Sequence, residues 1–131
     1  MEREIKFRAY HKERKEIFEI ASIDFEEKKA ALSNGIIKLL NVDFKQFELL
    51  QYTGVKDKNN KQIYEGDIVK IIKLEGYGEY CDQVEYTGRI ECYISEFRIQ
   101  PLNLRLSNES TVEIEIIGNI YENKNLLEEN K

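Results

Sequence analysis

The sequence has no tryptophan, and only one proline, one methionine and one histidine among its 131 residues. It also lacks an apolar stretch of the 18 or more residues that would cross a bilayer, because Lys70 and Lys73 interrupt its densest apolar run, residues 68–74. We therefore expect no membrane span. The first five residues mix charges and lack the pattern of a secretory signal, so we expect a cytoplasmic protein.

Cysteine is also scarce. Cys81 and Cys92 are the only two in the chain, and although they could lie opposite each other on a hairpin, the lack of a secretion signal favours two reduced thiols. Zinc requires closely spaced Cys or His ligands, whereas these cysteines are eleven positions apart with no histidine nearby. We predict no metal site and no cofactor.

The residues that enzymes use are poorly placed for catalysis. The single histidine, His11, precedes the charged residues 12–15, which favour a solvated loop position over a buried catalytic base. The glycines of residues 76–78 lack the pattern of a nucleotide-binding loop. Glu113 and Glu115 share the polar face of a strand, where a solvated row is favoured over a carboxylate-pair hydrolase or magnesium site. We predict no catalytic residue and no enzymatic activity.

The residue types that are abundant favour β-strands. The chain has 17 Ile, 5 Val, 3 Thr, 6 Phe and 8 Tyr against 4 Ala. Hydrophobic residues make up 41% of the sequence, which is enough for the core of one compact domain at this length. We predict a mainly β fold with at most one short helix, formed by a single domain over residues 1–123 and followed by a polar tail, residues 124–131.

The net charge of −5 is unevenly distributed. Residues 76–131 have five basic and eleven acidic side chains, whereas the rest of the chain is close to neutral. Because duplex nucleic acid is held mainly by clustered Lys and Arg, this balance argues against a broad nucleic-acid-binding surface. The same charge balance does not exclude a small basic patch.

Alternation of apolar and polar residues predicts the clearest strands. Residues 112–116 alternate with period two, and the change of phase at residues 117–118 indicates a bulge. Alternation also marks Ile90, Cys92 and Ile94. Residues 68–74 fit both helix and strand periods, and their β-branched side chains favour a strand.

Several short motifs predict turns. Thr87-Gly88 indicates a hairpin turn between two short strands, and Asn59-Asn60 indicates another turn. Pro101 is expected at a bend or on an edge strand. Asp24 as a cap, Glu27 at the capping-box position and the stop signal of residues 34–35 predict the one short helix.

Residues 51–69 form the most distinctive segment, QYTGVKDKNNKQIYEGDIV. We interpret it as a strand, a polar loop and a Gly66-Asp67 turn that begins another strand. Gly66 can adopt backbone conformations that other residues avoid, and the Asp67 carboxylate can accept hydrogen bonds from nearby amides. This combination also occurs in small SH3-like barrels.

Residues 5–10 (IKFRAY) and 117–123 (IGNIYEN) extend the pattern. With residues 51–69 between them, the chain resembles the YopX-like proteins encoded by phages and prophages of Gram-positive bacteria. The family usually has Trp at the position of Tyr10 and Gly at the position of Asn60. Tyrosine keeps an aromatic ring with a polar end, and asparagine can adopt the left-handed turn conformation. Residues 11–46 and 76–110 offer little to match.

The resemblance implies a complex antiparallel sheet folded into a pseudo-barrel, in a phage or prophage protein of the bacterial host cytoplasm. It supplies no settled activity and no catalytic residues. On this interpretation Gly54, Gly66, Asp67 and Gly118 are structural turn residues.

Two regions are candidates for binding. Tyr77 and Tyr80, in a glycine-rich stretch, could present their rings to a protein partner, although packing of their loop over the barrel mouth is favoured. Lys56, Lys58 and Lys61 form a basic loop, which lies beside Tyr52 and Tyr64 and could bind nucleic acid. A soluble turn explains that loop more simply.

Our hypothesis is a module that binds a protein, which could be a second copy of itself. Nucleic-acid binding through the Lys56–Lys61 loop is the alternative, and an unrecognised hydrolase comes third.

Overall fold

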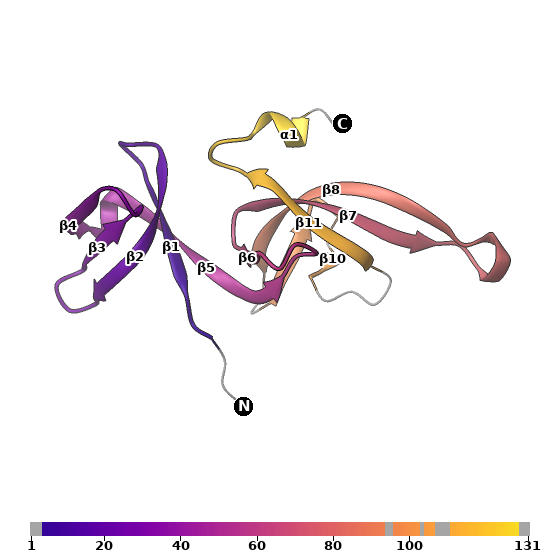
Figure 1. Cartoon of the computed structure of the whole chain (residues 1–131), viewed down its shortest axis with the longest axis horizontal. Helices are drawn as coiled ribbons and strands as arrows, with labels where there is room; N and C mark the ends of the chain where they lie inside the picture. The colour runs from indigo at the N-terminus through magenta and orange to yellow at the C-terminus, as the bar shows by residue number, and fades with distance from the viewer. Residues whose placement is uncertain (1–3, 94–95, 103, 107–110, 129–131) are drawn as a thin grey trace. The chain divides into compact units, whose positions relative to one another are not determined.

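The computed structural model describes residues 4–93, 96–102, 104–106 and 111–128 (Figure 1). These residues form a mainly β structure with two antiparallel sheets, as the composition predicts. The chain divides into two compact units, residues 1–52 and 53–131, with the boundary inside strand β5.

The first sheet has six strands in the order β4-β3-β2-β1-β5-β6. Their bounds are β1 (Phe7–His11), β2 (Glu16–Asp24), β3 (Lys29–Ser33), β4 (Lys38–Asp43), β5 (Phe47–Lys56) and β6 (Gln62–Tyr64). A one-turn 3-10 helix, η1 (Phe44–Gln46), joins β4 to β5. Ala9, Phe18, Ala30, Leu32, Val42 and Phe47 form the buried core of the first unit.

The helix predicted over residues 24–35 is wrong, because its cues belong to two turns. The Asp24 carboxylate accepts hydrogen bonds from the backbone N–H groups of Glu26 and Glu27, and so caps the turn between β2 and β3. The side chain of Asn34 caps the next turn in the same way, accepting from the N–H groups of two following residues. Capping residues stabilise tight turns as well as helix starts.

The second sheet has five strands in the order β10-β9-β8-β7-β11. They are β7 (Asp67–Glu75), β8 (Asp82–Tyr93), β9 (Glu96–Gln100), β10 (Leu104–Arg105) and β11 (Thr111–Asn119). A 3-10 turn, η2 (Gly78–Tyr80), joins β7 to β8, and the short helix α1 (Asn125–Glu128) follows β11. The buried core of this unit is Ile63, Val69, Ile71, Ile90, Ile99 and Leu106.

The strand predictions for residues 68–74 and 112–116 are confirmed. They correspond to β7 and β11, and the register between these strands shifts between Ile116 and Gly118, where the bulge was predicted. β7 lies between β8 and β11 in the sheet, and its residues 67–69 and 71 are buried. Its sequence is correspondingly rich in apolar residues.

The hairpin turn predicted at Thr87-Gly88 is wrong, since β8 runs through both residues. Gly88 has a different role there. A Cβ atom on it would lie 2.5 Å from Ile99 Cγ2 and 2.8 Å from the carbonyl oxygen of Gln100, so β9 packs where a side chain would be. A glycine inside a strand marks close approach as often as a turn.

The remaining sequence predictions are placed as follows. Asn60 has a φ of 65° in the predicted turn, and Pro101 lies in the turn between β9 and β10. Cys81 and Cys92 are free and exposed, and they lie just before β8 and near its far end, so they do not face each other across a hairpin. Ile94, predicted to continue the strand alternation, is outside the described residues.

The pairings among the described strands close neither sheet into a barrel, because the two outermost strands of each sheet pair on one side only. The pseudo-barrel implied by the resemblance is therefore not established by these pairings. In the described part of the chain, no helix is both long and apolar enough to span a membrane.

Candidate functional site

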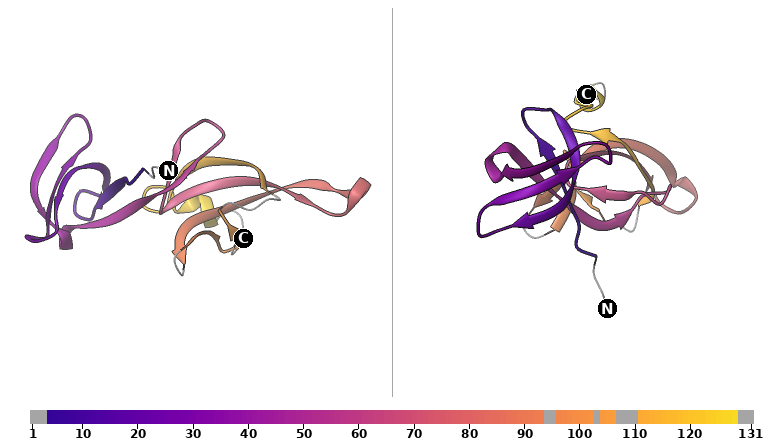
Figure 2. Two further views of the ribbon diagram at one scale, coloured as in Figure 1. Left: turned by 90° about the horizontal axis from the view of Figure 1, so that it is seen from below. Right: turned by 60° about the vertical axis from the view of Figure 1, so that its left-hand side comes forward.

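The hairpin of β7 and β8 projects beyond the strands that flank it. β11 pairs with β7 only as far as Lys73, and β9 pairs with β8 only from Arg89 onwards. The pairs Leu74–Gln83 and Glu75–Asp82 therefore extend as a two-stranded arm (Figures 1 and 2). We call residues 75–82 the tip of this arm.

The tip has a defined backbone. Gly76 has a φ of 115°, and a Cβ atom there would collide with the carbonyl oxygen of Tyr80. The N–H of Tyr80 donates to the carbonyl oxygen of Tyr77 at 2.9 Å, which closes the one-turn 3-10 helix η2. Glycine at position 76 therefore allows the chain to reverse tightly enough to set both tyrosines on one short turn.

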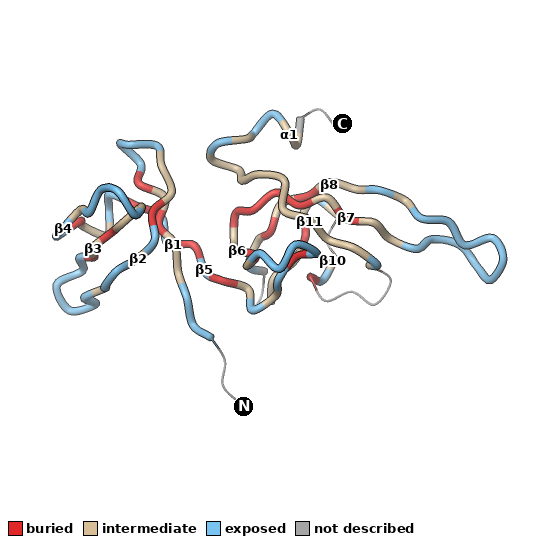
Figure 3. Tube along the Cα trace, in the orientation of Figure 1, coloured by how far each residue is buried: buried red, intermediate tan, exposed pale blue. Residues whose placement is uncertain are grey.

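Both tyrosine side chains are almost fully in solvent. Tyr77 is 91% exposed and Tyr80 is 83% exposed, and the whole tip is exposed in Figure 3. Packing of this loop over a barrel mouth, the interpretation that the sequence favoured, is therefore wrong. Two large rings exposed together on one short turn form an apolar patch of the kind that marks interaction surfaces.

Three carboxylates share the tip with the two tyrosines. Glu75, Glu79 and Asp82 lie in the tip, which has no basic residue. The hydroxyl group of Tyr86 donates to the Glu75 carboxylate across the arm, and this hydrogen bond raises the pKa of Tyr86. The tip thus combines apolar ring surface with a charge of −3.

The second candidate region, the loop of residues 57–61, is built around a buried carboxylate. Asp57 Oδ1 accepts from the backbone N–H groups of Asn59 and Lys61, each at 2.9 Å, and Oδ2 accepts from that of Ile116 at 3.0 Å. The N–H of Lys58 donates to the carbonyl oxygen of Ile114. The loop is therefore tied to the outer edge of β11.

Two effects oppose each other at Asp57. Burial raises the pKa of this carboxyl group, but the hydrogen bonds from Ile116, Lys61 and Asn59 together outweigh it and leave the pKa below its ordinary value of 3.8. Hydrogen bonds to the ionised form have this effect because protonation would weaken them.

The loop is a weaker basic site than its sequence suggests. Lys58 Nζ lies 3.4 Å from Glu113 Oε2 and 3.8 Å from Glu115 Oε2, so two carboxylates already neutralise it. Tyr52 is 6% exposed and Tyr64 is 1% exposed, so neither ring offers a stacking surface to a base. That part of the sequence interpretation is wrong, because both rings face the interior.

The four turn residues hold backbone together. Gly54 and Gly66 have φ values of 87° and 88°, and Asp67 Oδ2 accepts from the N–H of Tyr64 at 2.8 Å. A Cβ atom on Gly118 would lie 2.6 Å from Asn123 Oδ1, which accepts from the N–H of Asn119.

Hydrogen bonds also join the three motifs of the sequence. The carbonyl oxygen of Gly66 accepts from the N–H of Ile120, which links residues 51–69 to 117–123. Phe7 pairs with Gln51, which links residues 5–10 to the same segment.

His11 was expected in solvent, but it is buried at the end of β1. Its Nδ1 accepts from the backbone N–H of Arg14 at 3.2 Å, and its ring packs edge-on against Phe18. His11 follows Ala9 at the period of two that a strand imposes, and both are buried, so this spacing indicates the environment of His11 better than the charged residues 12–15 do. Within the described ranges, no group of three or more His, Cys, Asp and Glu side chains is placed to hold a metal ion.

Comparison with known proteins shows similarity both to a protein family and to a solved structure. The model of the family described as YopX protein matches residues 6–128. The fold is similar to the crystal structure of protein EF1440 from Enterococcus faecalis, with a TM-score of 0.62 and 23% sequence identity over 96% of this chain and 99% of that one. No curated protein matches the chain.

Proposed function

The chain belongs to the YopX protein family, and on that premise we propose that it is a binding module without catalytic activity, which recognises a protein through the tip of the β7–β8 arm. The observation that carries this proposal is the exposure of Tyr77 and Tyr80 on a projecting turn. A phage or prophage origin and action in the host cytoplasm, which the resemblance implies, belong to the same proposal.

The geometry of the tip supports binding to a protein. Tyrosine is enriched among the residues that dominate interface energies, because its ring buries a large area at little cost in conformational entropy. The fixed turn between Gly76 and Tyr80 lowers that cost further, since the rings do not have to be brought together on binding.

Nucleic-acid binding through Lys56, Lys58 and Lys61 has less support. Of these three lysines, Lys58 is paired with carboxylates, and the aromatic rings beside the loop are buried. A hydrolase has less support still. Glu113 and Glu115 both lie near Lys58, and Glu115 also lies 3.5 Å from Lys70 Nζ, as expected for ion pairs on a strand surface.

The proposal is tested with three forms of the full chain used as bait in host cell extract. These are the wild type, a tip variant with Tyr77→Ser and Tyr80→Ser, and a control with Phe25→Ser and Ile36→Ser. The control removes two apolar side chains that are 68% and 93% exposed in the other unit. Any protein captured, including this chain itself, is then purified and its affinity for each form is measured.

We expect a partner that binds the wild type and the control equally and the tip variant at least about tenfold more weakly, a typical loss for a central aromatic contact. A purified partner that binds the tip variant as tightly as the wild type would overturn the proposal. So would a control variant that loses as much affinity as the tip variant.

A further inference from the structure

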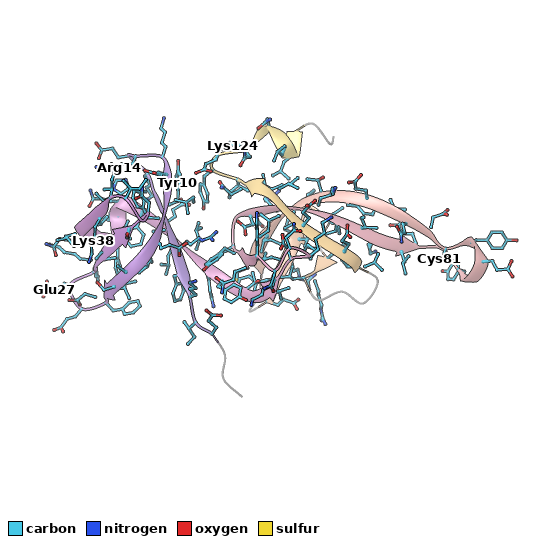
Figure 4. The ribbon with its side chains drawn as sticks, viewed as in Figure 1. Tyr10, Arg14, Glu27, Lys38, Cys81 and Lys124 are labelled. Atoms are coloured by element: carbon cyan, nitrogen blue, oxygen red, sulfur yellow. The ribbon has the colours of Figure 1, made fainter. Side chains whose placement is uncertain are left out.

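The first unit contains an open hollow of about 590 Å³ beside the edge strand β4. Leu39, Leu40 and Val42 give it an apolar wall, and Arg14 and Lys38 stand at its rim. Figure 4 shows Arg14 and Lys38 on this part of the molecule. We call this the basic hollow. Its lining contains one carboxylate, Glu13, against two permanent positive charges.

A bulge in β4 forms the apolar wall. The register between β3 and β4 passes from Leu32–Leu39 to Ala30–Val42, so Leu40 and Asn41 both lie opposite Ala31. Asn41 takes a φ of 54°, which few residues other than glycine and asparagine adopt readily. As a result Leu40 is 66% exposed at the hollow instead of packing in the core.

The basic side of the hollow is held by the turn between β1 and β2. The N–H of Lys12 donates to the carbonyl oxygen of Gln46 at 3.0 Å, and that of Lys15 donates to the carbonyl oxygen of His11 at 2.8 Å. In the same turn, the N–H of Arg14 donates to Nδ1 of buried His11. Residues 12–15 have three basic side chains and one acidic side chain, which add to the positive charge near the rim.

We propose that the basic hollow binds the tip of the β7–β8 arm of a second copy of this chain. This inference rests on the proposed function, because it names the partner that the tip recognises. The tip offers two exposed tyrosine rings and three carboxylates, and the hollow offers the exposed side chain of Leu40 in a lining that also contains Arg14 and Lys38. An arginine can also contact the face of a tyrosine ring favourably.

Charge decides which surface of a second copy the tip can meet. Two tips would bring six carboxylates together, and residues 53–131 have a net charge of −5 from ten basic and fifteen acidic side chains. Residues 1–52 are neutral overall, with ten of each. Like charges in contact oppose association, so contact between tip and hollow is favoured over contact between two tips.

Such a contact joins two different surfaces and leaves a free tip on one copy and a free hollow on the other. Association of this kind continues to a ring or an open chain of copies and does not stop at a symmetric dimer.

The first test is sedimentation of the full chain at low salt over a range of concentrations. The wild type should self-associate, and association should weaken as salt screens the charges. Reversal of the hollow charges with Arg14→Glu and Lys38→Glu should weaken it at least about tenfold. A control with Lys28→Glu and Lys56→Glu changes the net charge equally, at two exposed residues that neither line the hollow nor lie in the tip, and should keep the association.

Exchange of the charges tests the pairing directly. Tip reversal with Glu79→Lys and Asp82→Lys should weaken association to a similar extent, and a chain that combines it with Arg14→Glu and Lys38→Glu should recover association. In addition, a mixture of the Tyr77→Ser/Tyr80→Ser variant with the hollow variant should form a complex with one copy of each, because one wild-type tip and one wild-type hollow are then available.

A wild type that stays monomeric at every concentration would overturn this inference, and so would association that survives reversal at the hollow. Neither result contradicts the proposed function if another protein still binds the tip and needs both tyrosines to do so. Self-association that survives loss of both tyrosines, with no other tyrosine-dependent partner, would overturn both proposals.

Discussion

At the scale of single residues, Asp57 is the side chain with the most structural connections in the distinctive loop. Its carboxylate holds two N–H groups of its own loop and the N–H of Ile116, which lies 59 positions away. A charge that is buried with three donors stabilises the fold only while it stays ionised and all three donors stay in place.

Replacing Asp57 with asparagine should destabilise the protein by about 1–3 kcal/mol at neutral pH, because an amide nitrogen cannot accept the hydrogen bond from Ile116. The pKa of Asp57 is lower in the folded state than its ordinary 3.8, so its contribution is complete above that value and is lost as the pH falls through the folded-state pKa. Denaturant unfolding should therefore show the gap between wild type and Asp57→Asn narrowing below pH 3.8. A constant gap would contradict this role.

Gly88 leads to a different prediction. Gly88→Ala should destabilise the protein by about 1–3 kcal/mol, because the new methyl group would overlap the side chain of Ile99 and the backbone at Gln100. Thermal unfolding would measure the loss, with Thr87→Ala in the same strand as the control. An alanine variant as stable as that control would show that β9 can move aside.

The sequence could predict the role of a single residue only where that role depends on the residue's own backbone or its nearest neighbours in the chain. The turn conformations of Asn60 and Gly66 follow from their own backbone preferences. Gly88 could not be assigned in the same way, because its requirement comes from β9, about ten residues further along the chain. His11 was misplaced because its charged neighbours in sequence are not its neighbours in the fold.

At the scale of elements, β7 and β11 were predictable because burial of one or both faces leaves a regular apolar pattern. The helix assigned to residues 24–35 failed because capping and stop signals are shared by tight turns. The β4 bulge that builds the basic hollow has no such pattern, since its exposed Leu40 interrupts the alternation.

The arm also gives a prediction at this scale. Gly76→Ala should disturb the tip, because its methyl group would collide with the carbonyl of Tyr80, but the fold should keep its stability, since the arm extends beyond the flanking strands. Nuclear magnetic resonance should show shifts confined to residues near 74–83, and partner binding should weaken. Shifts throughout the second sheet would mean that the tip is not an independent feature.

The loop of residues 57–61 predicts a negative result for nucleic acid. We expect no measurable binding of single-stranded DNA or RNA even at low salt, where phosphate contacts are strongest, because Lys58 is already paired with Glu113 and Glu115. Fluorescence anisotropy would measure this. Binding that weakens with salt and disappears when Lys56, Lys58 and Lys61 are changed to glutamine would restore the alternative function.

At the scale of the whole molecule, the described residues form two buried clusters, one in each unit. The single domain predicted over residues 1–123 stays a prediction, because separate clusters can still unfold together if the shared strand β5 couples them. Overall composition could not indicate this division, because it does not record which apolar residues pack together: the first buried cluster consists of Ala, Phe, Leu and Val, and the second mainly of Ile.

Phe18→Ala tests how far the units are coupled. Removing this buried ring should cost about 3–5 kcal/mol in the first unit. If the units open separately, hydrogen exchange should show lost protection in β1 to β4 and unchanged protection at Ile71 and Ile99. Equal loss in both units would instead support one cooperative domain.

The attachment of the 57–61 loop to β11 also bears on misassembly. At Ile114 and Ile116 the outward backbone groups of this end strand are already occupied, by Lys58 and Asp57. A strand with unpaired backbone groups along its free edge is a template on which other chains can add and form fibrils. By holding this loop against β11, Asp57 is therefore expected to make growth of fibrils on that strand less favourable.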